Sequence, residues 1–121
     1  MRNASRPGPT PVLGFTPTAA LLCRYGRDAS HEKVVRGALV TSASRLREVA
    51  EQANKLVPLT SSTELFCPLD NGGFIDVYFW NDTHDLRLRV QTSGCRFIER
   101  TGGIYREQSG SFVADLMSLT R

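Results

Sequence analysis

The chain has 121 residues, a formal net charge of +3 and 40% hydrophobic residues, a composition typical of one small folded domain. Its sequence contains no apolar stretch near the roughly 18 residues that cross a bilayer, so it predicts no membrane span. The basic residues are scattered along the chain, a distribution that does not favour a dedicated nucleic-acid domain.

Prolines dominate the N-terminal segment, where Pro7, Pro9, Pro11 and Pro17 lie within residues 1–18. Proline lacks a backbone N–H and cannot join a regular ladder. The pattern predicts a disordered Pro-rich arm over residues 1–18 and a single domain over residues 19–121. It leaves two locations open: the cytoplasm, or an extracytoplasmic site reached after removal of a targeting segment.

Two strands and a helix are predicted next along the chain. Residues 19–25 and residues 34–41 are apolar segments of strand length. Over residues 42–57 the apolar period changes to about 3.6, which predicts an amphipathic helix with Ser42 or Ser44 as its N-cap. Pro58 then ends the helix, because the residue before a proline avoids helical geometry.

Residues 74–80 and residues 86–92 alternate between apolar and polar side chains, so the register of their pairing follows from pattern alone. One register sets every apolar residue of one strand opposite an apolar residue of the other: Ile75 with Val90, Val77 with Leu88, and Phe79 with Leu86. On the other face it sets Asp76 opposite Arg89 and Tyr78 opposite Arg87. A shift of one residue destroys both sets.

A short hairpin over residues 96–100 and 104–107 and a C-terminal helix over residues 111–119 complete the predicted elements. Together the elements predict an α+β fold, with an antiparallel sheet of four to five strands and two helices packed on one face.

Three cysteines offer the first candidate chemistry. The predicted hairpin brings Cys67 and Cys95 near each other at the base of its two strands, so these two are the disulfide candidates and Cys23 is the candidate free thiol. Three reduced thiols are the alternative. No two of the cysteines have the short spacing of structural zinc sites, so we predict no metal site and no cofactor.

Other residues define two rival functions. Cys23 and Cys95 each precede an arginine that could depress a thiol pKa, which leaves a thiol-dependent redox or nucleophilic enzyme open. Tyr78, Trp80, Arg87 and Arg89 are predicted on one face of the hairpin, the candidate binding face. Aromatic residues interleaved with arginines on a sheet are typical of some single-strand nucleic-acid binders.

Four motifs resemble a group of small actinobacterial proteins that are often secreted or associated with the envelope. The motifs are Cys23-Arg24-Tyr25, the segment from Asn54 to Pro58, the segment Cys67-Pro68-Leu69-Asp70-Asn71-Gly72, and Gly94-Cys95. The resemblance covers roughly residues 20–119 and implies neither an activity nor catalytic residues. The sequence as a whole therefore predicts a non-catalytic binding or interaction module, with a protein or a small ligand as its partner.

Overall fold

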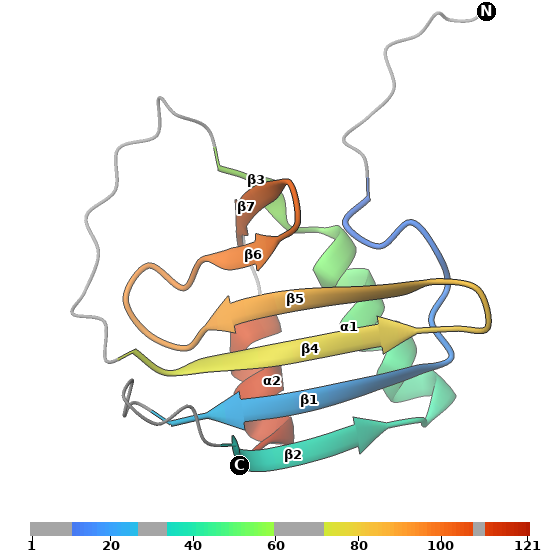
Figure 1. The fold of residues 1–121 in the computed structure, drawn as a ribbon, viewed down its shortest axis with the longest axis horizontal. Coiled ribbons are helices and arrows are strands. Elements are labelled where there is room, and N and C mark those ends of the chain that lie inside the picture. The colour runs from blue at the N-terminus through green and yellow to red at the C-terminus, as the bar shows by residue number, and fades with distance from the viewer. Residues whose placement is uncertain (1–10, 27–33, 60–71, 108–110) are drawn as a thin grey trace, which may run out of the picture.

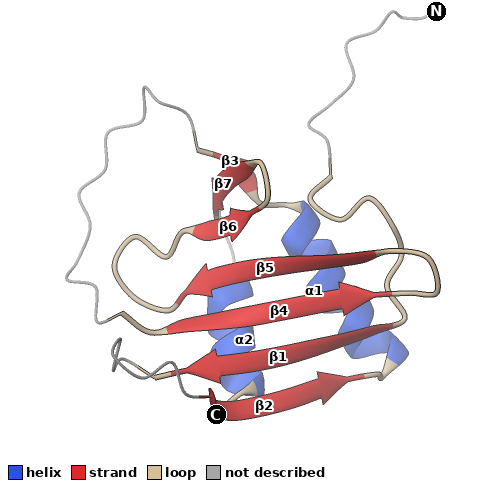
Figure 2. Ribbon diagram, in the orientation of Figure 1, coloured by secondary structure: helices blue, strands red, loops and turns tan. Residues whose placement is uncertain are grey.

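The computed structural model describes residues 11–26, 34–59, 72–107 and 111–121, and in them one antiparallel sheet is covered on one face by two helices (Figures 1 and 2). The predicted α+β class is confirmed. In chain order the elements are β1 (Ala19–Tyr25), β2 (Val34–Val40), α1 (Ala43–Asn54), β3 (Val57–Pro58), β4 (Phe74–Trp80), β5 (Asp85–Gln91), β6 (Ile98–Arg100), β7 (Gly103–Arg106) and α2 (Phe112–Leu119).

The strand order is β2-β1-β4-β5-β6-β7-β3, so β1 lies inside the sheet between its sequence neighbour β2 and the distant β4. Both of these pairings are antiparallel, with Leu22 opposite Ala38 on one side and Val77 on the other. Among the described residues, no helix is both long enough and apolar enough to cross a membrane.

The register predicted for the central hairpin is confirmed. Ile75 pairs with Val90, Val77 with Leu88, Phe79 with Leu86, Asp76 with Arg89 and Tyr78 with Arg87. Five of the six apolar side chains are fully buried, namely Ile75, Val77, Phe79, Leu88 and Val90. The alternation fixes the register, because a slip of one residue would move these side chains from the core to the opposite face.

The sheet has seven strands, more than the four to five predicted. The additional strand β3 contains only Val57 and Pro58, which pair with β7, and the Leu59 amide next to it donates to the Ile104 carbonyl at 2.8 Å. A segment of two residues carries no alternation, so its pairing could not be read from the sequence. The predicted helix over residues 42–57 is correspondingly shorter and ends at Asn54.

Both helices are amphipathic and bury one stripe against the sheet. α1 contributes Leu46, Val49 and Ala53 to the core, and α2 contributes Phe112, Val113 and Leu116. A hydrogen bond of 2.6 Å from the Gln52 side chain to the Asp115 carboxylate links the two helices. Ser42 occupies the predicted N-cap of α1, but its hydroxyl lies 3.3 Å from that of Ser44 and makes no capping bond.

The folded domain begins before residue 19, which corrects the predicted arm. Val12 and Leu13 retain only 1% and 3% of their surface exposure, and Pro17 is also buried. The Leu13 amide donates to the Asn54 side chain at 2.7 Å, which ties the segment to the end of α1. Proline-rich chain is extended whether it is packed or disordered, so the proline count could not distinguish the two states. Residues 1–10 lie outside the described residues.

Candidate functional site

The sheet face opposite α1 and α2 is covered by no described helix or strand, and we call it the open face; both helices lie behind the sheet in Figure 2. Alternation along four paired strands determines which side chains it carries. They are Leu21, Cys23 and Tyr25 from β1, Gly37 and Leu39 from β2, Phe74, Asp76, Tyr78 and Trp80 from β4, and Asp85, Arg87, Arg89 and Gln91 from β5.

One half of the open face is occupied by a network around Arg89. Its guanidinium donates from Nε to Asp76 Oδ1 at 2.9 Å and from Nη2 to Asp76 Oδ2 at 3.0 Å. The Arg89 side chain is 32% exposed, whereas that of Asp76 is only 2% exposed. The guanidinium carbon also lies 4.1 Å from the centre of the Phe74 ring, and Tyr25 stacks on that ring at 4.6 Å. Arg89 is therefore held by a buried carboxylate and an aromatic ring.

The same network shifts the titration of Tyr25. Burial of the phenol, followed by the neighbouring Tyr78 and Asp76, raises the pKa of Tyr25, and Arg89 opposes the shift. Each of the first three contributions disfavours the phenolate: burial removes its hydration, and Tyr78 and Asp76 add negative charge nearby when they are ionised.

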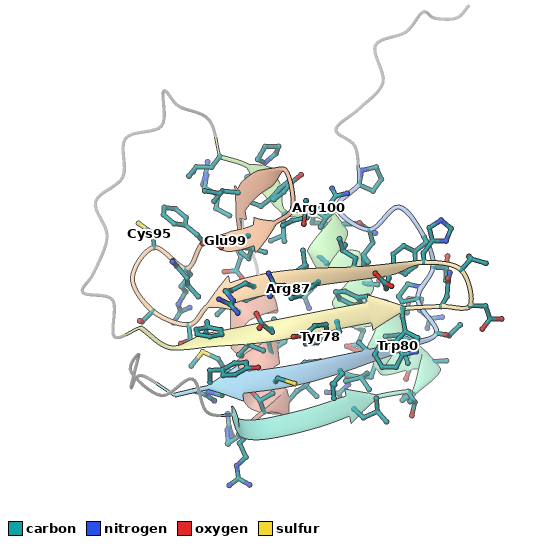
Figure 3. All side chains as sticks on the ribbon, viewed as in Figure 1. Tyr78, Trp80, Arg87, Cys95, Glu99 and Arg100 are labelled. Atoms are coloured by element: carbon teal, nitrogen blue, oxygen red, sulfur yellow. The ribbon has the colours of Figure 1, made fainter. Side chains whose placement is uncertain are left out.

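The other half of the open face carries Tyr78 opposite Arg87 and Trp80 opposite Asp85. Figure 3 shows Tyr78 and Trp80 along β4 with Arg87 on the neighbouring strand. Arg87 is exposed, whereas the two aromatic side chains are half-buried. Beside them lies a hollow of about 470 Å³, and its lining residues are Tyr78, Phe79, Trp80, Asp85, Leu86 and Arg87.

The structure therefore brings together the four residues of the predicted binding face, but in two different states. Arg89 is engaged with Asp76 and Phe74, while Tyr78, Trp80 and Arg87 surround the hollow. Leu21 and Leu39 extend the same face and were not predicted as part of it. Alternation within residues 19–25 and 34–41 gives their side of the strand, but only the positions of the helices show which side stays open.

Cys23 is a free thiol and lies half-buried on the open face between Gly37 and Asp76. The arginine beside it points to the other face, where Arg24 donates to the Met117 carbonyl of α2 at 3.5 Å. The residues opposite Cys23 on the two neighbouring strands are therefore Asp76, which brings a carboxylate, and Gly37, and neither brings a positive charge. A lone thiolate gains stability from nearby positive charge, which this arrangement does not place against it.

Of the two histidines, only His84 lies within the described residues. It follows Trp80 in the loop between β4 and β5, stacks on Phe15 at 5.4 Å and has its Nδ1 2.8 Å from the Thr83 hydroxyl. Cys23 pairs with Asp76, four residues back along β4 from Trp80, which is about 13 Å at the rise of a strand. His84 is therefore too far away to act as a base for this thiol.

Cys95 lies in the turn between β5 and β6, and Figure 3 shows its position at that end of the sheet. Gly94 has a φ of 69°, the left-handed conformation that glycine adopts at little cost, and it lets the chain turn there. Cys67, its predicted partner, lies outside the described residues, so the pairing stays a prediction. Among the described residues no three histidine, cysteine or acidic side chains group to hold a metal.

A second hollow, of about 620 Å³, separates residues 15–18 from α1 and carries Arg47 and Glu51 among its lining residues. It contains none of the predicted site residues. Comparisons with protein-family models, with curated proteins and with solved structures return no significant match. The site is therefore defined by its own geometry, and the open face is where aromatic and arginine side chains gather.

Proposed function

We propose that the protein is a non-catalytic module that binds another protein through the open face of its sheet. One observation carries the proposal: Tyr78, Trp80 and Arg87 surround a hollow on a face that no described element covers. Tyrosine, tryptophan and arginine are the residue types that dominate the energetics of protein interfaces. The exposed Leu39 extends the apolar part of the face toward the edge of the sheet.

The charges of the face favour a protein partner over a nucleic acid. The charged side chains of the open face are two arginines and two acidic residues, namely Arg87, Arg89, Asp76 and Asp85. A groove that follows a phosphate backbone needs a surplus of positive charge. Here Arg89 is already paired with Asp76, and the remaining Arg87 is balanced by Asp85, so the face has no surplus of positive charge.

The surroundings of Cys23 support the non-catalytic reading over a thiol enzyme. A nucleophilic cysteine needs an oriented base within hydrogen-bond reach. In the described part of the chain Cys23 faces Asp76, whose carboxylate is engaged with Arg89, and His84 lies at the other end of β1. Cys23→Ser replaces only the sulfur, so it is expected to weaken binding less than Trp80→Ala does, whereas a thiol enzyme would lose its activity.

The test places a photoactivatable benzoylphenylalanine at position 78 and crosslinks the protein in its native host. A captured protein is then purified and its affinity for the chain is measured by calorimetry. Because central aromatic and arginine contacts carry most interface energy, we expect Trp80→Ala and Arg87→Glu each to weaken binding about tenfold or more. Arg47→Glu is the matched control, since Arg47 is an exposed arginine on α1, away from the open face.

Two results would count against this function. A captured protein that binds Trp80→Ala and Arg87→Glu as tightly as the parent would show that the open face is not the site. Salt-dependent binding of a single-stranded oligonucleotide that is lost when Arg87 and Arg89 are replaced would instead support the nucleic-acid function.

A further inference from the structure

The two edges of the sheet differ in how they are protected. Edge strands expose unpaired backbone N–H and C=O groups, and proteins protect them with short strands, proline or lysine. β3, at one edge, has two residues and includes Pro58. β2, at the other edge, has seven residues, Val34–Val40, with neither proline nor lysine among them and Arg36 as its one charged residue. The β2 edge therefore offers a full strand of backbone groups for pairing.

The outer side of β2 is unoccupied by the described part of the chain. There β2 pairs with β1 alone, and Figure 1 shows no labelled element beyond it. Leu39 lies on this strand with 62% of its surface exposed, against 44% for Ile104, the other large hydrophobic residue exposed in the described part of the chain. An unprotected backbone edge and an exposed apolar side chain thus occur on the same strand.

We propose that β2 pairs antiparallel with β2 of a second copy of this chain, about a two-fold axis at Ala38, so that two sheets join into one. In a symmetric pair each strand meets its own sequence in reverse. Ala38 then faces Ala38 of the second copy, Leu39 faces Gly37, and Arg36 faces Val40. This pairing needs no residue other than those already on the edge.

Side-chain size supports this register. Gly37 has no side chain, and a Cβ placed there would meet only the Leu22 carbonyl oxygen at 3.7 Å. The Leu39 side chain of the second copy can therefore lie over Gly37 on the open face. The smallest side chain of the strand interior, Ala38, faces its own copy at the axis. An axis at Gly37 would instead leave two glycines facing each other without a side-chain contact.

Charge also supports the register. An axis at Arg36 would set two guanidinium groups directly opposite each other, which is destabilising in a sheet. With the axis at Ala38, Arg36 faces an apolar residue and lies four positions along the strand from its copy. That separation is about 13 Å, beyond the screening length of about 10 Å at 0.1 M salt.

The first experiment measures the oligomeric state of the full chain by sedimentation velocity from micromolar to near-millimolar concentration. A pairing of one strand is a small interface, so we expect a reversible dimer of twice 13.4 kDa that forms as the concentration rises. Leu39→Lys places a charge on the edge and is expected to weaken the dimer about tenfold or more. Ile104→Lys, an equal change on β7, is expected to leave the dimer intact.

The second experiment tests the register by oxidative crosslinking in a Cys23→Ser background. Facing residues of antiparallel strands have Cα atoms about 4.5–5.5 Å apart, within the range of a disulfide. Ala38→Cys is expected to give a covalent dimer, whereas Ile104→Cys and the background protein are not.

Four results would overturn the proposal. A protein that is monomeric at every concentration tested has no such pairing. A dimer that persists unchanged in Leu39→Lys uses another surface. Crosslinking of Ile104→Cys as rapidly as Ala38→Cys shows that the dimer does not meet at β2. A strand of another protein that binds β2 of a chain that remains monomeric also overturns it.

Discussion

Replacing Arg89 with methionine would leave the Asp76 carboxylate in the sheet without the guanidinium that donates two hydrogen bonds to it. The methionine keeps part of the apolar stem of the arginine, so the change isolates the loss of charge. The Asp76 side chain is 2% exposed, so its carboxylate depends on Arg89 rather than on solvent for these hydrogen bonds. We expect Arg89→Met to destabilise the fold.

The magnitude follows from the burial of the pair. Removing one partner of a buried ion pair costs about 3–5 kcal/mol, because the other charge stays buried. Arg89 is itself 32% exposed, so solvent screens part of the interaction and the lower end of the range applies. Loss of the contact with the Phe74 ring adds up to about 1 kcal/mol. The expected loss is therefore about 3–4 kcal/mol.

The assay is urea unfolding followed by far-UV circular dichroism and by the fluorescence of Trp80, the only tryptophan. The double variant Asp76→Leu with Arg89→Met removes both charges and is expected to recover about 2 kcal/mol relative to Arg89→Met alone. A loss below about 1 kcal/mol in Arg89→Met, or a double variant no more stable than the single one, would refute the reasoning.

Two further predictions test other parts of the structure. Leu13→Ala is expected to cost about 2–4 kcal/mol in urea unfolding, because Leu13 is 3% exposed and its truncation leaves a cavity in the core. Burial raises the pKa of Tyr25 above its ordinary value of 10.0, so the folded protein keeps the phenolic proton at a pH where the unfolded chain releases it. The contribution of Tyr25 to the free energy of unfolding is fully present below pH 10 and is lost as the pH rises through the folded pKa. Tyr25→Phe is therefore expected to reduce the loss of stability at alkaline pH.

Each of these two predictions has its own control and contrary outcome. Leu39→Ala removes the same atoms from a position that is exposed in the monomer, so its cost in dilute, monomeric protein is expected to stay below about 0.5 kcal/mol. Equal costs for Leu13→Ala and Leu39→Ala would contradict the packing of residues 12–13 in the core. For Tyr25, unfolding is measured from about pH 8 to about pH 11, and parallel stability curves for the parent and Tyr25→Phe would show that the phenol is not linked to folding.

Local pattern predicted the parts of the fold that depend on neighbouring residues. Alternation over residues 74–80 and 86–92 predicted the register and the Asp76–Arg89 pair, because only one register keeps all apolar residues on one side. The helical period of residues 42–57 predicted α1, because it places the apolar side chains along one face of a helix. The pairing of β1 with β4 and the burial of Val12 depend on contacts between distant segments, for which a single sequence carries no comparable signal.

The candidate site divides in the same way. Its membership was predictable, since Tyr78, Trp80, Arg87 and Arg89 alternate onto one face of the hairpin. The division of these residues into an engaged Arg89 and three residues around the hollow was not predictable. The stacking of Tyr25 on Phe74, the ring that Arg89 contacts, depends on the placement of β1 beside β4. The open character of the face depends in turn on both helices packing on the other side.

The position of β1 between β2 and β4 has a consequence for folding kinetics. β1 can form a hairpin with β2 early, but β4, the other neighbour of β1 in the sheet, begins about 50 residues after β1 ends. Closing a loop of that length costs chain entropy before any new contact repays it, and such pairings slow folding. During synthesis the edge of β1 that pairs with β4 therefore stays unpaired until β4 has been made. We expect the rate-limiting step of folding to be the docking of the β4–β5 hairpin onto β1.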